Sequence, residues 1–149
     1  MGTSAAGRRV TLDDLGAWLV KGNADQADLA GRFREDPRVT TWCVQPTYRI
    51  HLIRAGQPVL FWASGSRSRA TTYGIWGLGH TTGPAHEEAH GWSIPLDLVI
   101  AEPADRVSRE ELRHDPALHD LEVLRLPVGA NPSFVSVEQF TAVRRYLSR

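Results

Sequence analysis

Six short extended segments, separated by glycine, proline and polar residues, constrain the fold of this chain more than any other feature. They cover residues 17–21, 39–44, 59–63, 73–80, 92–100 and 121–127, where β-branched and aromatic residues end at turn formers. Helices are predicted at 24–34, 108–113 and 136–147 from apolar spacing and capping residues, whereas 48–54 fits either a helix or a strand. Because strands and long helices do not alternate strictly, a doubly wound parallel sheet is disfavoured. We predict an α+β fold: a small, mixed, strongly bent β-barrel of five to six strands, flanked by helices.

The length of 149 residues suits one domain with its own core. The start of the chain, residues 1–9, is small and polar with two arginines, and residues 1–10 are predicted to be a flexible tail before a single domain at 11–149. Cys43 is the one cysteine, so no intrachain disulfide can form, and no apolar run approaches membrane-spanning length. These features predict a cytoplasmic protein that does not enter a membrane.

Charge is distributed unevenly along a chain whose net charge is 0. Residues 37–86 contain five arginines and no acidic residue, which gives this stretch a formal charge of +5 and leaves −5 for the remainder. A basic region of this kind can attract phosphates even in a neutral protein. The alternative is that these arginines only cover a solvated face.

Several segments, taken in order, resemble the EVE domain family. They are the opening Trp-Leu-Val-Lys at 18–21, Thr-Trp-Cys-Val at 41–44, the Ile-Arg-Ala-Gly-Gln-Pro-Val-Leu-Phe-Trp-Ala-Ser-Gly run at 53–65, Tyr-Gly-Ile-Trp-Gly at 73–77, and the Gly-Ala-Asn-Pro-Ser-Phe and Val-Glu-Gln-Phe segments at 129–134 and 137–140. The similarity spans about residues 15–147. Gln57 replaces an acidic residue of the family pattern, and Gly22-Asn23-Ala24 replaces Ser-Glu-Pro.

This resemblance implies a PUA-like fold related to YTH domains. It also implies a non-catalytic protein, of the kind found in bacterial defence systems beside nucleases, that binds DNA or RNA carrying a modified base. We expect the protein to be a monomer. No metal and no organic cofactor is implied. The base would be flipped into an aromatic pocket whose stacking wall is Trp42, with Trp62 lining or supporting it. For any one of the five tryptophans, packing in the core is the alternative reading.

Stacking is nearly blind to base identity, so selectivity requires contacts to the edge of the base. The candidates for these contacts are Lys21, Gly22, Asn23, Cys43, Ser64 and Asn131, and ordinary turn chemistry is the alternative for Ser64 and Asn131. The candidates for phosphate contacts are Tyr48, Arg49, Arg67 and Arg69. For the loop at 65–69, the alternative is a solvated tip.

One motif indicates a different chemistry. Residues 86–90 read His-Glu-Glu-Ala-His, the H-E-x-x-H pattern in which two histidines on one helical face bind zinc and the glutamate acts as a base. Glycines and a proline flank the motif, which favours a polar loop at 83–91. A zinc-dependent hydrolase using His86, Glu87 and His90 is therefore one alternative function. A protein-interaction module without a working pocket is another.

Overall fold

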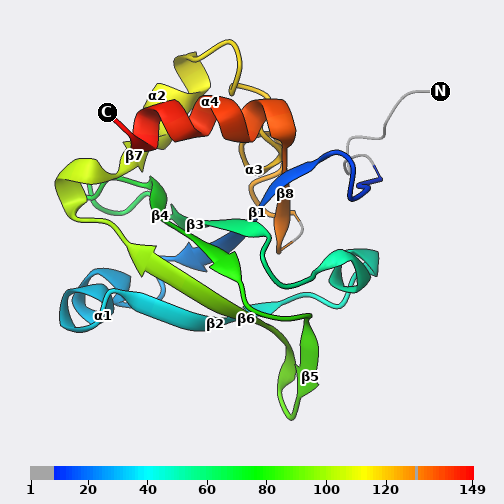
Figure 1. Cartoon of the computed structure of the whole chain (residues 1–149). Helices are drawn as coiled ribbons and strands as arrows, with labels where there is room; N and C mark the ends of the chain where they lie inside the picture. Colours follow the sequence, from blue (N-terminus) through cyan, green and yellow to red (C-terminus); the bar gives the residue numbers. More distant parts are fainter. Residues whose placement is uncertain (1–8, 130) are drawn as a thin grey trace.

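The computed structural model describes residues 9–129 and 131–149, which fold around one mixed sheet (Figure 1). Its strands are β1 (Leu15–Asn23), β2 (Arg38–Val44), β3 (Pro58–Ser64), β4 (Gly74–Thr81), β5 (His86–Glu88), β6 (Gly91–Ile100), β7 (Val107–Ser108) and β8 (Ser133–Ser136). Its α-helices are α1 (Leu29–Glu35), α2 (Arg109–His114), α3 (Glu122–Arg125) and α4 (Val137–Leu147). Two 3₁₀ turns, η1 (Tyr48–Leu52) and η2 (Pro103–Asp105), complete the elements of the described residues.

The sheet is open rather than closed. Its strands run in the order β2-β6-β4-β3-β1-β8, with β5 paired to β6 and β7 paired to β4. β1 is parallel to β3, and the other ladders are antiparallel. The predicted α+β class and mixed sheet are confirmed, but the predicted barrel of five to six strands is wrong. The sheet has eight strands, and within the described residues no ladder joins the terminal strands β2 and β8.

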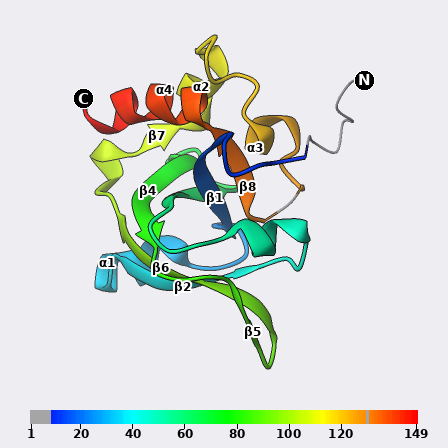
Figure 2. The ribbon, with the colours of Figure 1, turned by 45° about the vertical axis from the view of Figure 1, so that its right-hand side comes forward.

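Strand β3 is buried on both faces of the sheet, whereas β2 and β6 alternate between buried and accessible residues. On β3, Val59 and Phe61 contribute to one apolar cluster, whereas Leu60 and Trp62 contribute to a second. A strand buried on both sides carries an uninterrupted apolar run rather than an alternating one, which is why residues 59–63 predicted a strand so clearly. Helix α1 lies beside one face, and α2 and α4 lie on the opposite side (Figure 2).

The helix caps confirm two predictions and correct a third. Ser108 with Glu111, and Ser136 with Gln139, form reciprocal capping boxes at the starts of α2 and α4. Helix α1 begins later than predicted, because the carboxylate of Asp28 rather than Asn23 caps it.

Other sequence predictions are corrected as well. The segment at 121–127, predicted as extended, contains the short helix α3, and the ambiguous segment at 48–54 forms η1. Strands β5, β7 and β8 were not predicted, because each has only two to four residues and gains its order from a neighbouring strand. The predicted tail overlaps the folded domain: Val10 is 3% exposed and its backbone N–H donates to the Tyr48 hydroxyl at 2.6 Å. Residues 1–8 of that tail lie outside the described residues.

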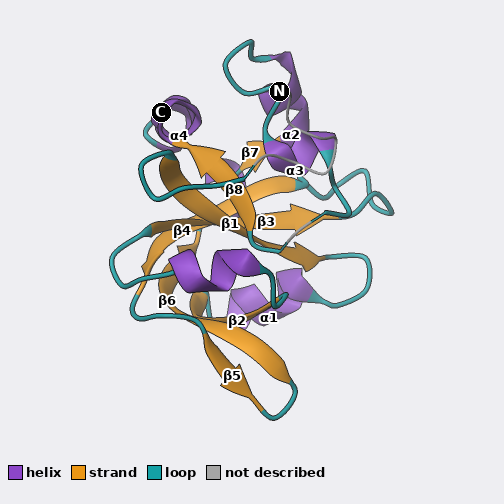
Figure 3. Ribbon diagram, turned by 90° about the vertical axis from the view of Figure 1, so that its right-hand side faces the viewer, coloured by secondary structure: helices purple, strands orange, loops and turns teal. Residues whose placement is uncertain are grey.

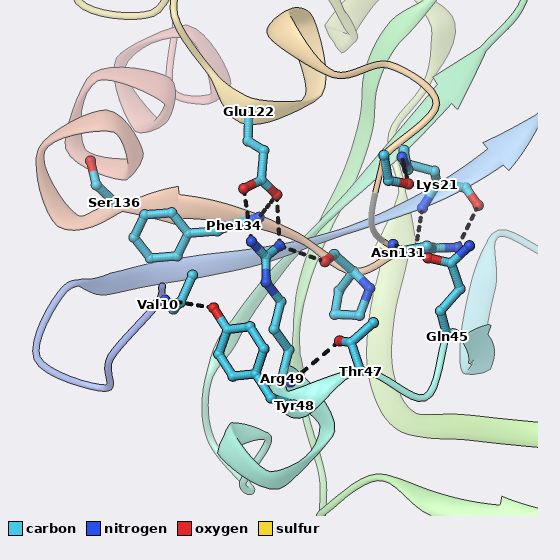
Figure 4. A network of polar contacts seen from close by, with 12 residues as sticks. Val10, Lys21, Gln45, Thr47, Tyr48, Arg49, Glu122, Asn131, Phe134 and Ser136 are labelled. Atoms are coloured by element: carbon cyan, nitrogen blue, oxygen red, sulfur yellow. Dashed lines mark hydrogen bonds and ion pairs between the residues drawn. The ribbon is translucent and has the colours of Figure 1, made fainter. Parts of the chain in front are cut away.

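A buried ion pair joins η1 to α3 and β8 (Figure 4). Arg49 Nη1 and Nη2 donate to the two carboxylate oxygens of Glu122 at 2.6 and 2.8 Å. The side chain of Arg49 is 5% exposed and that of Glu122 is 6% exposed. Arg49 Nη1 also donates to the carbonyl of Pro132, and the carboxylate of Glu122 accepts the N–H of Phe134. Burial lowers the pKa of Arg49, but the hydrogen bond and charge of Glu122 outweigh it and leave the pKa raised. The prediction that Arg49 contacts phosphate is therefore wrong, since its guanidinium is occupied inside the protein.

Removing one partner of this pair should destabilise the fold strongly. Glu122→Ala leaves a buried guanidinium unpaired and should lower the free energy of unfolding by about 3–5 kcal/mol, measured by urea denaturation. The control is Arg149→Ala, which breaks the exposed pair between Arg149 and Glu111 and should change stability little. Equal losses in the two variants would contradict the structural role assigned to Glu122.

Candidate functional site

The indole of Trp42 lies half-buried on β2, where this strand passes the end of β1. Its Nε1 donates to the backbone carbonyl of Lys21 at 2.9 Å. Its ring meets that of Phe61 edge-on, with centroids 4.8 Å apart and planes at 87°. The Cζ of Arg32, on α1, lies 5.4 Å from the centre of the indole. The ring is thus held in one orientation, is partly accessible, and has a cation beside it.

Gly22 is required for this arrangement. A Cβ at this position would lie 2.9 Å from Cζ of Phe61, 3.0 Å from Leu29 and 3.0 Å from Cζ2 of Trp42. A side chain would therefore push the two aromatic rings apart. The predicted site residue Gly22 contributes by having no side chain, which leaves room for the rings of Trp42 and Phe61.

The side-chain amide of Asn131 connects β1 to β2, which share no ladder in the described residues (Figure 4). Its Oδ1 accepts the N–H of Lys21 at 3.1 Å, while its Nδ2 approaches the carbonyls of Lys21 and Cys43 at 3.4 and 3.5 Å. Gln45 N–H donates to the Asn131 carbonyl at 2.7 Å, and Gln45 Oε1 accepts the Asn131 N–H at 3.2 Å. Asn131 therefore sets the relative position of the two strands that carry Lys21 and Trp42.

The Lys21 side chain braces the segment that precedes Asn131. Its Nζ donates to the carbonyls of Gly129 at 2.9 Å and Pro127 at 3.3 Å. Burial lowers the pKa of the Lys21 amine, partly offset by the negative charge of Glu122. Lys21 contributes backbone groups to the site, while its amine is used to hold the neighbouring loop.

A second polar cluster, around Asp25, follows directly after β1. The Asp25 carboxylate accepts the N–H groups of Ser66 and Arg67 at 2.8 and 3.2 Å and the hydroxyl of Tyr73 at 2.9 Å. Gly65 has a φ of +149°, and a Cβ there would lie 2.3 Å from Cε1 of Tyr73. These contacts give the loop between β3 and β4 a defined shape, against the reading of residues 65–69 as a loose solvated tip.

Four further predicted residues, Asn23, Ser64, Arg67 and Arg69, belong to the segments that form this cluster. The Ser64 hydroxyl donates to the carbonyl of Gly22 at 3.2 Å, and the Asn23 side chain accepts the N–H groups of residues 25 and 26. Asn23 thus shapes the turn after β1, whereas the Ser64 hydroxyl makes a contact between β3 and β1 and not the turn contact that was the alternative to base contact. Arg69 is exposed on the loop, as is Arg67. The fold therefore places Lys21, Gly22, Trp42, Cys43 and Asn131 together, with Ser64, Asn23 and the two arginines next to them.

Trp62 and Tyr48 lie elsewhere. Trp62 is 4% exposed and packs in the apolar cluster opposite to the one that Phe61 joins. This burial leaves no ring face for a base, so the pocket role predicted for Trp62 is not supported. Tyr48 is half-buried on η1, where its hydroxyl accepts the N–H of Val10 and Arg9 lies 4.4 Å from its ring centre.

Sequence reasoning missed four residues that shape the site: Arg32, Gln45, Phe61 and Asp25. Phe61 belonged to a recognised strand, but its face could not be assigned, because the whole run is apolar. Gln45 and Asn131 are 86 residues apart, and no local pattern links them. Asp25 and Arg32 both lay within the helix predicted at 24–34, where no local pattern linked them to the site.

The H-E-x-x-H motif lies on a projecting β-hairpin and not on a helix (Figure 3). His86 and Glu87 belong to β5, which pairs with β6, and His90 follows in the turn. His86 Nε2 and His90 Nε2 lie 2.7 and 3.6 Å from the carboxylate of Glu88, which is not the glutamate the zinc motif uses as a base. Across the described ranges, no three metal-ligating side chains gather in a way that could hold a metal ion. The helical geometry that the zinc motif requires is absent at this hairpin.

No protein-family model matches the chain, and no curated protein matches it. Solved structures do match. A hypothetical protein from Leishmania major has a TM-score of 0.61 at 17% identity, over 93% of this chain and 98% of the other. A protein from Pseudomonas putida has a TM-score of 0.62 at 17% identity, over 88% and 99%. These matches establish a shared fold and leave the EVE resemblance a prediction.

A YTH domain from Zygosaccharomyces rouxii, in complex with N6-methyladenosine RNA, matches at a TM-score of 0.42 and 8% identity, over 87% of this chain and 86% of the other. This likeness is too distant to support an argument about the ligand.

Among the described residues, no helix is both long and apolar enough to span a bilayer.

The Asp25 cluster predicts a specific pH dependence. Hydrogen bonds from the Ser66 N–H, the Tyr73 hydroxyl and the Arg67 N–H hold the pKa of Asp25 below its ordinary value of 3.8. The ionised Asp25 carboxylate therefore stabilises the folded protein fully at a pH above 3.8. This stabilisation is lost as the pH falls through the lower pKa that Asp25 has in the folded state. Asp25→Ala should lower the melting temperature at pH 7, and its difference from the wild type should shrink in acid. The control is the exposed Asp97→Ala, and a pH-independent difference for Asp25→Ala would contradict the assignment.

Proposed function

We propose that this protein binds DNA or RNA and holds one extruded base against the indole of Trp42. The observation that carries the proposal is the fixed but partly accessible ring: its Nε1 donates to the Lys21 carbonyl, it meets the Phe61 ring edge to face, and the Arg32 guanidinium lies over it. Trp18 and Trp76 are enclosed in the protein at 0% and 1% exposure, whereas part of the Trp42 ring stays accessible. An ordered, accessible indole flanked by a guanidinium is suited to stacking on a flat, electron-rich ligand.

The energetics require more than one contact. Stacking of a base on an aromatic ring contributes about 1–3 kcal/mol, and extruding a base from a duplex costs a few kcal/mol. Stacking alone therefore offsets little more than extrusion, and attraction to phosphates must supply the net affinity. The acid-free stretch at 37–86 supports this requirement, because it contributes the exposed Arg67 and Arg69 on the loop that Asp25 holds.

Selectivity is assigned to polar groups around the ring. The carbonyl groups of Lys21 and Cys43 and the side-chain amide of Asn131 all lie at the junction of β1 and β2. Because Asn131 is held from both strands, these groups are preorganised and can discriminate between base edges at little entropic cost. The EVE resemblance supports a modified base, whose added group would be sensed by its fit beside the half-buried indole. Catalysis has no part in this proposal.

The proposal is tested with a panel of plain and modified oligonucleotides, in DNA and RNA form, measured by fluorescence anisotropy at low salt. Trp42→Ala should weaken binding of the preferred oligonucleotide by about 1–3 kcal/mol, because the stacking surface is removed. The matched control is Trp92→Ala, a half-buried tryptophan on β6, which should leave binding unchanged.

Circular dichroism establishes whether Trp42→Ala remains folded. Trp42→Phe retains a ring and should preserve part of the affinity if Trp42→Ala is unstable. Unchanged binding by folded Trp42→Ala would contradict the proposal. The absence of binding by the wild type to every oligonucleotide would instead favour a protein-interaction module.

A further inference from the structure

We propose that a polar groove beside the Asp25 cluster binds a backbone phosphate of the same nucleic acid; this rests on the proposed function and extends it to the flanking strand. The groove has a volume of about 360 Å³ and lies between the loop at 66–73 and the start of α2. Its lining includes Ser68, Arg69, Thr71, Thr72, Ser108 and Arg109, beside Tyr73 and Glu110, so that apolar surface is mixed with the hydroxyls and guanidiniums. Hydroxyl and guanidinium groups on one concave surface can donate hydrogen bonds to the oxygens of a phosphate.

The two arginines come from different elements. Arg69 is on the loop between β3 and β4, and Arg109 is the first residue of α2. The Arg109 side chain is 25% exposed, and its Cζ lies 5.1 Å from the centre of the Tyr73 ring. This contact restricts the position of the guanidinium before any ligand binds, which lowers the entropic cost of a contact.

The floor of the groove is held in place by the Asp25 cluster. Tyr73, which lies beneath Arg109, donates its hydroxyl to Asp25, and the same hydroxyl accepts the N–H of Ser68 at 3.0 Å. The Ser68 hydroxyl in turn accepts the N–H of Ala70 at 3.2 Å. The loop that carries Arg69 is therefore shaped by specific hydrogen bonds and is suited to a fixed ligand position.

Charge around the groove favours an anion. Arg69 and Arg109 line it with one acidic residue, Glu110, whose carboxylate lies 3.8 Å from Nε of Arg109 and whose side chain is 67% exposed. A pair this exposed contributes little, so an incoming phosphate can replace Glu110 at small cost. Glu110 then acts as a weak competitor for Arg109.

The groove and Trp42 are connected through one short segment. Gly22 packs against the indole, the Ser64 hydroxyl donates to the Gly22 carbonyl, and Asp25, three residues after Gly22, holds the loop that forms the groove wall. The base site and the groove therefore lie on the same end of β1 and β3.

The test compares salt-dependent oligonucleotide binding across variants. Arg109→Ala and Arg69→Ala should each weaken binding about tenfold, the loss expected for one charge-assisted contact. Each should also lower the slope of log affinity against log salt by about 1 and act equally on plain and modified oligonucleotides, because a phosphate contact carries no base information. Glu110→Gln should strengthen binding about twofold to fivefold. The matched control is Arg113→Ala, an arginine of the same helix with a 53% exposed side chain that does not line the groove.

Two outcomes would overturn the inference while leaving the base site intact: unchanged affinity and salt slope in both groove variants, or losses equal to that of Arg113→Ala. Arg69 is exposed, so its variant addresses the case in which Arg109→Ala is unstable. A titration of the wild type with inorganic phosphate, followed by amide NMR shifts, tests the groove independently of base recognition. Saturable shifts confined to residues 66–73 and 108–110 are expected. Their absence would overturn the phosphate groove, whereas a wild type that binds no oligonucleotide would overturn the proposed function.

Discussion

The bidentate ion pair between Arg49 and Glu122 is the interaction on which the rest of the site depends. It is buried and also bonds to the backbone at residues 132 and 134, so it fixes the start of β8. Asn131 directly precedes that segment and connects Lys21 to the strand carrying Trp42. A chain of short polar contacts therefore runs from the buried pair to the indole. Because a buried charge is costly without its partner, this arrangement is strongly specified.

The two proposed subsites divide the physical work of recognition. The Trp42 site provides a flat surface and oriented polar groups, which distinguish one base from another but contribute modest affinity. The groove at Arg69 and Arg109 provides charge, which contributes affinity without base information. Asp25 couples them, since it follows the strand beside Trp42 and holds the loop that carries Arg69. Such a division allows selectivity in a chain with net charge 0.

Elements with strong local signals were predictable. The apolar runs at 59–63 and 92–100 became strands, and Ser108 and Ser136 capped helices through contacts three residues away. Elements whose order comes from distant neighbours were not predictable. β8 exists because it pairs with β1 more than 110 residues earlier in the chain, and residues 122–125 became helical although their apolar content suited a strand.

The sequence by itself determined the α+β class, most strand positions, the acid-free basic stretch and the candidacy of Trp42. Only the tertiary structure decided which candidates share a site: Trp42 remains half-buried while Trp62 enters the core, and Arg69 faces solvent while Arg49 is paired inside. The physical reason is that burial and pairing depend on partners far along the chain, 73 residues for Arg49 and Glu122 and 110 for Lys21 and Asn131. Local composition is the same for a buried and an exposed arginine, and only the packed neighbours distinguish them.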